Sequence, residues 1–211
     1  MKIEVIDAVK KFSDHVVLKQ VNMVMENGMI NGVVGRNGSG KTVLMKCICG
    51  FLRLDSGMIR VNDQIIGKDV DMLDDVGMII ENPGFLPNYT GYKNLEFLYG
   101  INHPKNKKCI MDAMTQVGLD PHLKRHVGKY SLGMRQRLGI AQAIMEDPKI
   151  LILDEPMNGL DHHGVEDIRK LLLGLKEKGK NILIASHNRE DIDILCDHVW
   201  EMDQGVLKEM R

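Results

Sequence analysis

Short runs of apolar residues, separated by polar breaks, predict β-strands in the first eighty positions. The segments 3–9 and 16–25 alternate apolar and polar residues, are rich in β-branched side chains and are followed by Ser13-Asp14 and Asn27-Gly28. Two further runs, 57–62 and 76–80, have the same character, and a turn at Asn62-Asp63 ends the first. The pattern therefore predicts a strand-rich N-terminal part.

The hydrophobic pattern changes to helical spacing from about residue 84 to about residue 146, with breaks at Pro104, Gly118 and Pro121. Continuously apolar strands follow at 150–153 and 182–185, as expected for central parallel strands. The segment between these strands has an amphipathic helix pattern, and 199–210 predicts a hairpin turning at Gln204-Gly205. Since no repeat or low-complexity linker interrupts the chain, we expect one domain over 1–211, with a helical subdomain inserted at about 84–146.

Composition limits the kinds of partner. The chain has 211 residues, is 44% hydrophobic and 27% charged, and has a formal net charge of -1, so no nucleic-acid partner is expected. The alternating start is unlike a signal peptide or anchor, and no run approaches the roughly 20 apolar residues of a membrane span. We therefore expect any role at a membrane to depend on another chain.

Metal and disulfide chemistry has little support in the spacing of cysteines and histidines. The four cysteines form no C-x-x-C pair, so reduced and mostly buried thiols are expected. His122 and His126 stand four residues apart and could share a metal, but no carboxylate or thiol nearby completes a ligand set.

The segment Gly35–Thr42 matches the phosphate-binding pattern G-x-x-x-x-G-K-[ST]. It follows a strand-like run at 30–34 and precedes a helix-compatible segment, which favours a phosphate loop over a chance glycine-rich turn. The glycines let successive backbone N–H groups converge on the phosphates of a nucleotide. Lys41 would reach the β- and γ-phosphates, and the Thr42 hydroxyl would bind Mg²⁺. The expected nucleotide-binding residues are Gly35, Asn37, Gly38, Ser39, Gly40, Lys41 and Thr42.

Two carboxylates, Asp154 and Glu155, end the buried strand at 150–153, and such strand ends bind ligands in α/β sheets. We expect Asp154 to hold Mg²⁺ through its water shell, and Glu155 to orient and deprotonate an attacking water. The alternative is that these acids only favour the start of a helix.

Between these two motifs lies Tyr130–Arg137, with the sequence YSLGMRQR. With this order of motifs, the chain resembles an ATP-binding-cassette (ABC) ATPase over essentially all of its 211 residues. The resemblance implies an α/β P-loop NTPase core with a mixed central sheet, an N-terminal antiparallel β-subdomain and an inserted helical subdomain. It also implies that Ser131 and Gly133 of one subunit close over the γ-phosphate of ATP bound by another subunit.

The same resemblance implies roles for three further positions. Asn158–Asp161 corresponds to a loop that contacts the other subunit, and His187 to a histidine that contacts the γ-phosphate and positions water. Phe12 corresponds to the aromatic residue that stacks on adenine. Without the resemblance, His187 could be a structural histidine, and Phe12 could be a packed core residue.

The chain departs from the family pattern at Glu81, where glutamine is usual, and at Leu132 and Met134 in the signature segment. The Glu81 carboxylate can still ligate Mg²⁺ or hold water, with altered pH and metal dependence, whereas the signature changes could weaken closure on the nucleotide. The segments 81–90 and 131–138 are similar to the bacitracin-resistance and lantibiotic self-protection branch of bacterial ABC exporters.

This resemblance implies a cytoplasmic ATPase subunit that hydrolyses ATP to ADP and phosphate, with ATP and Mg²⁺ as cofactors. It would form a homodimer or heterodimer and act at the inner face of the membrane through a separate permease subunit, docked by the helical subdomain and the loop after Glu81. The exported cargo would be a peptide antibiotic or other drug. The alternatives are a soluble ABC ATPase acting on ribosomes or DNA, and a regulatory ABC ATPase.

Overall fold

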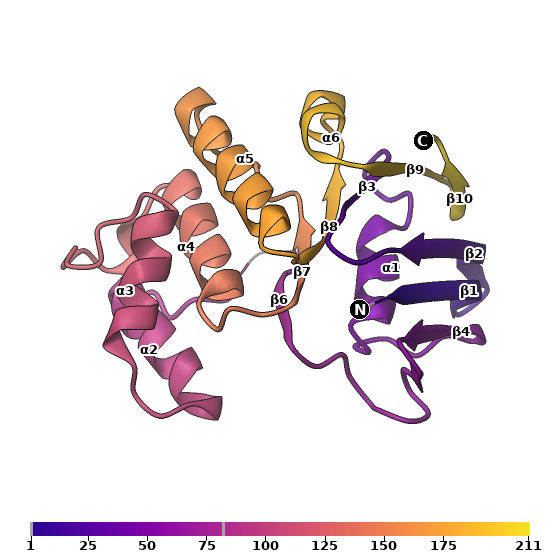
Figure 1. Ribbon diagram of the computed structural model, residues 1–211, viewed down its shortest axis with the longest axis horizontal. Helices are drawn as coiled ribbons and strands as arrows, with labels where there is room; N and C mark the ends of the chain where they lie inside the picture. The colour runs from indigo at the N-terminus through magenta and orange to yellow at the C-terminus, as the bar shows by residue number, and fades with distance from the viewer. Residues whose placement is uncertain (1, 82) are drawn as a thin grey trace.

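The computed structural model describes residues 2–81 and 83–211 and contains two β-sheets (Figure 1). The first is antiparallel, with strand order β2-β1-β4-β5. Its strands are β1 (Ile3–Phe12), β2 (His15–Met25), β4 (Ser56–Val61) and β5 (Gln64–Ile65). Met1 and Asn82, which belong to the predicted N-terminal alternation and to the segment 81–90, lie outside the described residues.

The second sheet has six strands in the order β10-β9-β3-β8-β7-β6. All its neighbouring strands are parallel except β9 and β10, which form an antiparallel hairpin. The bounds are β3 (Ile30–Val34), β6 (Val76–Ile79), β7 (Ile150–Asp154), β8 (Asn181–Ser186), β9 (His198–Asp203) and β10 (Val206–Glu209). The mixed sheet predicted from the sequence is therefore confirmed.

Helices cover both faces of this mixed sheet because alternate strand residues point to opposite sides. Ile150 and Ile152 share one core with α1 (Lys41–Ile48) and the antiparallel sheet. Leu151 and Leu153 face the other core, with α5 (His162–Glu177) and α6 (Arg189–Leu195). The phosphate-loop helix α1 is thereby held between the two sheets.

Three helices between β6 and β7 lie on the side of the molecule away from the antiparallel sheet (Figure 1). They are α2 (Gly91–Asn102), α3 (Lys107–Gln116) and α4 (Leu132–Ile144), and a short 3₁₀ turn, η1 (Val127–Lys129), precedes α4. The side chains of Thr90, Asn106 and Ser131 cap these three helices, each accepting a hydrogen bond from a backbone N–H in the first turn.

The predicted strands and turns agree with the structure except in three places. Strand β1 runs through Phe12, which the pattern placed between strands, and both β5 and α6 were not predicted. These two elements have two and seven residues, too few to show a hydrophobic period. Within the described residues, no helix is both long and apolar enough to cross a membrane.

Candidate functional site

The phosphate loop joins the end of β3 to the start of α1. Gly38 and Gly40 have φ values of 79° and 117°, a region that side chains disfavour, and a Cβ added at Gly35 would lie 2.3 Å from the Met202 carbonyl oxygen. The loop borders a pocket of about 290 Å³. The pocket is lined by Val17, Asn37, Gly38, Gly40, Lys41, Thr42, Val43, Asp154 and Glu155.

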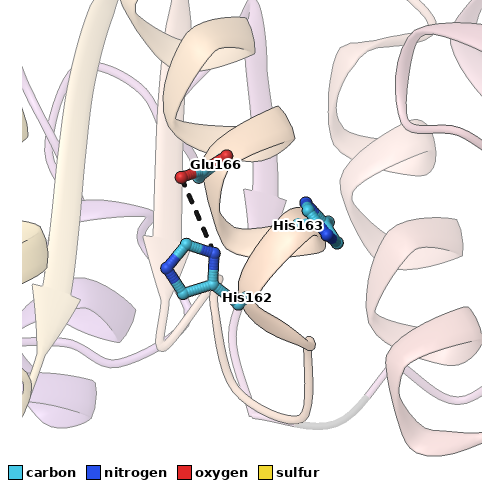
Figure 2. A group of neighbouring side chains, drawn as sticks. All are labelled: His162, His163 and Glu166. Atoms are coloured by element: carbon cyan, nitrogen blue, oxygen red, sulfur yellow. Dashed lines mark ion pairs between the residues drawn. The ribbon is translucent and has the colours of Figure 1, made fainter.

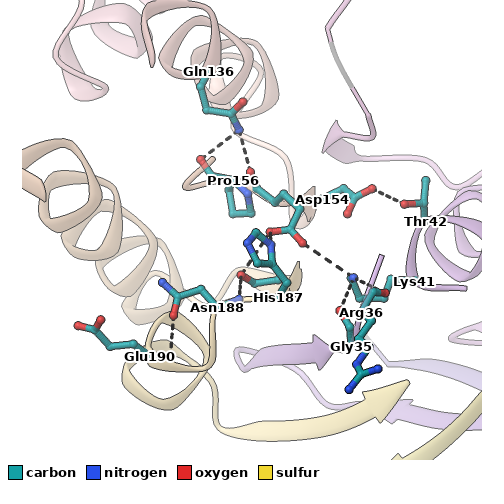
Figure 3. A network of polar contacts seen from close by, with 12 residues as sticks. Gly35, Arg36, Lys41, Thr42, Gln136, Asp154, Pro156, His187, Asn188 and Glu190 are labelled. Atoms are coloured by element: carbon teal, nitrogen blue, oxygen red, sulfur yellow. Dashed lines mark hydrogen bonds and ion pairs between the residues drawn. The ribbon is translucent and has the colours of Figure 1, made fainter. Parts of the chain in front are cut away.

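Lys41 is 6% exposed and turns back onto the loop (Figure 3). Its Nζ donates hydrogen bonds to the carbonyl oxygens of Gly35 at 2.6 Å and Arg36 at 3.3 Å, and lies 3.9 Å from Oε1 of Glu155. The buried Ser39 hydroxyl has no hydrogen-bond partner among the described residues. The loop thus has a buried cation and a spare hydroxyl donor, which fit an anionic phosphate group.

Strand register brings the carboxylates to this loop although they lie far along the chain. Parallel pairing aligns Val34 with Ser186 and Asp154 with Ala185, so β3, β8 and β7 end at one edge. There the Thr42 hydroxyl donates a 2.6 Å hydrogen bond to Oδ2 of Asp154 (Figure 3). Burial raises the pKa of the Asp154 carboxyl, although the Thr42 hydrogen bond opposes that shift. These two hard oxygen ligands fit a divalent cation such as Mg²⁺.

Glu155 has an uncommon backbone conformation for a residue with a side chain, with φ at 50°. Its N–H donates to the Ala185 carbonyl at 2.8 Å, which anchors the residue against β8. One carboxylate oxygen, Oε2, lies 2.8 Å from Nδ1 of His187. The other, Oε1, is buried and has no hydrogen-bond partner within the described part of the chain. Glu155 therefore has one oriented oxygen and one that is available to a proton donor.

Gln136 contributes to this site in a way that the sequence did not reveal. Its side-chain amide donates to the backbone oxygens of Glu155 at 3.1 Å and Pro156 at 3.0 Å, which links α4 to the loop after β7 (Figure 3). The signal available in the sequence was the position of Gln136 inside the signature segment. Val17, on β2, was also missed, although it lines the pocket.

The signature residues lie at the start of α4. The Ser131 hydroxyl caps the helix by accepting from the N–H of Met134 at 3.1 Å. Gly133 allows a close approach, since an added Cβ would lie 2.8 Å from the Gly159 carbonyl oxygen, and the half-exposed Leu132 packs against Gly159. Ser131 and Gly133 are not among the described residues that line the phosphate-loop pocket.

Glu81 and Phe12 also lie outside the lining of this pocket. Glu81 is 62% exposed in its side chain and forms a 2.7 Å ion pair with Nζ of Lys46 on α1. Phe12 is 45% exposed at the end of β1, with its ring centroid 5.4 Å from Nζ of Lys10. Their predicted contacts, with Mg²⁺ and with adenine, remain predictions.

A glycine loop at a helix start, a buried lysine and a Thr–Asp pair at adjoining strand ends together define a P-loop nucleoside triphosphatase. The profile of the family described as "ABC transporter" matches residues 18–158. The chain belongs to this family, in which it is an ATP-binding and ATP-hydrolysing subunit.

Three relatives show how similar the chain is to other ATP-binding subunits. "Uncharacterized ABC transporter ATP-binding protein YybJ" of Bacillus subtilis (strain 168) is 42% identical over 98% of this chain and 94% of its own length. "Bacitracin transport ATP-binding protein BcrA" of Enterococcus faecalis is 39% identical over 98% of this chain and 68% of its own length. "Lantibiotic transport ATP-binding protein SrtF" of Streptococcus pyogenes is 34% identical, with coverage of 94% and 85%. These relatives confirm the predicted branch and favour the transporter subunit over a soluble ABC ATPase.

Among solved structures, the fold matches the "Dimeric Structure of MJ0796, a Bacterial ABC Transporter Cassette" with a TM-score of 0.87. The match covers 99% of both chains at 20% sequence identity, so it concerns the fold. It confirms the predicted α/β P-loop core with its antiparallel and helical parts. Cassettes of this family work as dimers together with membrane subunits.

Proposed function

We propose that this chain uses ATP and Mg²⁺ to drive the export of a peptide antibiotic or other drug through a separate membrane subunit. The observation that carries the ATP-dependent part of this proposal is the meeting of Lys41, Thr42, Asp154, Glu155 and His187 at one edge of the mixed sheet. This arrangement provides phosphate binding, cation binding and a general base within one pocket.

Each residue has a distinct role in the proposed reaction. Lys41 would exchange its loop carbonyls for the β- and γ-phosphate oxygens. Thr42 and Asp154 would hold Mg²⁺, which would supply positive charge to the phosphates. Glu155 accepts the proton of the attacking water, and His187 orients that carboxylate through its 2.8 Å contact. Glu81 would have to leave its ion pair with Lys46 to reach that cation.

The catalytic site is proposed to be completed by a second cassette, either a second copy or a related chain. Ser131 and Gly133 do not line the phosphate-loop pocket that the described residues form, although Ser131 is exposed at the start of α4. A hydroxyl and the first N–H groups of a helix suit a phosphate oxygen. In a two-fold dimer, the signature of each chain would close the phosphate loop of the other.

The proposed location is the cytoplasmic face of the membrane, with the helical subdomain docked on the permease. Exposed apolar side chains on and before α2 support this surface: Leu86, Tyr89, Phe97 and Ile101. Export of bacitracin-like or lantibiotic-like cargo rests on the names of the relatives alone.

The two-chain site can be tested by mixing two inactive variants. Lys41→Ala removes the phosphate-binding cation, and Ser131→Ala removes the signature hydroxyl, so each homodimer contains only defective sites. A mixed dimer contains one intact site, and equimolar mixing should restore roughly a quarter of the wild-type ATPase rate.

Asn106→Ala is the matched control for Ser131→Ala, because Asn106 also caps a helix, by accepting from the Cys109 N–H at 3.3 Å. The control should keep full activity despite losing a cap. A Ser131→Ala protein that hydrolyses ATP normally, or a mixture that stays inactive although mixed dimers form, would contradict the composite site.

Docking is tested separately by cell fractionation in the native host. Phe97→Asp on α2 should move the chain from the membrane fraction to the supernatant, because it places a charge on the apolar docking surface. Ile194→Asp on α6, an exposed apolar position (49% against 41% for Phe97), should leave the distribution unchanged. Equal distributions for all three proteins would exclude α2 as the docking element.

A further inference from the structure

Two histidines and a glutamate gather at the start of α5, outside the nucleotide site. Figure 2 shows His162, His163 and Glu166 on the first turns of this helix. Nδ1 of His162 lies 3.6 Å from Oε1 of Glu166, and one ligand atom from each residue lies within 4.8 Å of the others. We propose that these three side chains form a binding site for a Zn²⁺-type divalent metal ion.

The distances are close to those that a tetrahedral zinc ion needs. With metal–ligand bonds of about 2.0–2.2 Å, neighbouring ligand atoms in a tetrahedron are about 3.4 Å apart. The contact between His162 and Glu166 already has nearly this length. The two remaining separations, each at most 4.8 Å, need to shorten by up to about 1.4 Å, which rotation about side-chain bonds supplies.

Helical geometry supports the grouping. Glu166 is four residues after His162 and three after His163, and both spacings bring side chains together on a helix surface. Asp161 caps the helix by accepting from the N–H of Gly164 at 2.9 Å, which holds the first turn in place. The helix therefore places each imidazole within reach of the Glu166 carboxylate.

The ligand types select the metal. Two imidazole nitrogens and one carboxylate oxygen form a common zinc ligand set, with the fourth position open to water. Mg²⁺ and Ca²⁺ prefer oxygen ligands, so this site differs in chemistry from the Thr42–Asp154 pair. The His162 side chain is 84% exposed, and its exposed contact with Glu166 contributes little as an ion pair alone, so both groups are available.

Other metal-binding groups in the described residues are less suited. His122 and His126 lie outside any α-helix, so their spacing of four does not place them on one helix face. Burial raises the pKa of the thiols of Cys47 to about 11, and of Cys49 and Cys196 to about 12, which disfavours the metal-binding thiolate. Cys109, which is half-buried, is the one thiol to remove in a test.

The test is a Zn²⁺ titration by calorimetry on the untagged full-length Cys109→Ser protein, without nucleotide or Mg²⁺. One Zn²⁺ should bind per chain, and Co²⁺ should give the intense visible absorption of a tetrahedral site. His163→Ala and Glu166→Gln should each weaken binding by roughly tenfold or more. The matched control, His122→Ala with His126→Ala, should bind as the parent does.

Circular dichroism checks that each variant keeps its helices. The proposal is overturned if Zn²⁺ does not bind, if the double variant His162→Ala/His163→Ala binds with unchanged affinity, or if only half an ion binds per chain. Because nucleotide is absent, the result does not depend on the proposed ATPase mechanism.

Discussion

Replacement of Glu155 by glutamine separates ATP binding from ATP hydrolysis. The amide has the shape of the carboxylate, and its oxygen can still accept from His187, whose Nδ1 is 2.8 Å away. It cannot accept a proton from water, so the loss of general-base catalysis should lower turnover by about 10²–10⁴-fold. That loss corresponds to a barrier increase of roughly 3–5 kcal/mol.

ATP binding by the same variant should be kept or strengthened, although hydrolysis is lost. Lys41 and Glu155 are largely buried and 3.9 Å apart, and at an effective dielectric constant near 20 their attraction is about 4 kcal/mol. Removal of the carboxylate charge frees Lys41 for the phosphates and removes a negative charge beside them. The variant should bind ATP at least as tightly as the wild type and accumulate as an ATP-bound dimer.

The assays are steady-state phosphate release, equilibrium binding of ATP, and sedimentation with and without ATP. Glu146→Gln is the control, since Glu146 pairs with the exposed His103 in the helical subdomain, outside the nucleotide site. A Glu155→Gln protein with wild-type turnover would remove Glu155 as the base. A variant that no longer binds ATP would refute the electrostatic argument.

Three other variants test the phosphate loop, the metal pair and the signature turn. Lys41→Ala should lower ATP affinity by at least about tenfold, since a charge-assisted bond contributes roughly 1.5–3 kcal/mol, and unchanged ATP binding in a titration would contradict the loop assignment. Burial raises the pKa of Asp154, so the nucleotide-free protein loses stability as pH rises above the ordinary Asp range through that raised pKa. Asp154→Asn should therefore be more stable in urea at pH 7, and its stability should depend less on pH. Its stability should also change less on addition of Mg²⁺. Gly133→Ala should lower the unfolding free energy by about 1–3 kcal/mol, because its Cβ would lie 2.8 Å from the Gly159 oxygen. Gly174→Ala, in α5, should raise it by about 0.5–1 kcal/mol, because its added Cβ would meet no described atom within 4 Å beyond its chain neighbours and the nearby backbone of its own helix. Equal urea midpoints for these two variants would contradict the packing argument.

The sequence by itself determined the features that depend on neighbouring residues. Gly38 and Gly40 meet a local need for positive φ, so the phosphate loop can be recognised from a short run of consecutive residues. The same holds for the turn at Gln204-Gly205, where both residues have positive φ, and for the continuously apolar strands β7 and β8. The order and spacing of the motifs were then sufficient to identify the family.

Only the tertiary structure decided which distant side chains meet. Thr42 and Asp154 are 112 positions apart and pair because β3, β8 and β7 end at one edge. Gln136 reaches the backbone of the Glu155 loop from α4, and nothing in the local sequence of α4 specifies that contact. The ion pair between Glu81 and Lys46 likewise depends on the packing of α1, so the spacing of motifs could not predict it.

The two histidine pairs show the physical reason most clearly. His122 and His126 have helical spacing, but the chain there forms a turn and an extended stretch, so the spacing places them on no common helix face. His162 and His163 carry no such pattern with each other, yet α5 brings Glu166 to both. Sequence spacing has chemical meaning only once the backbone conformation is known, and packing across the whole chain sets that conformation.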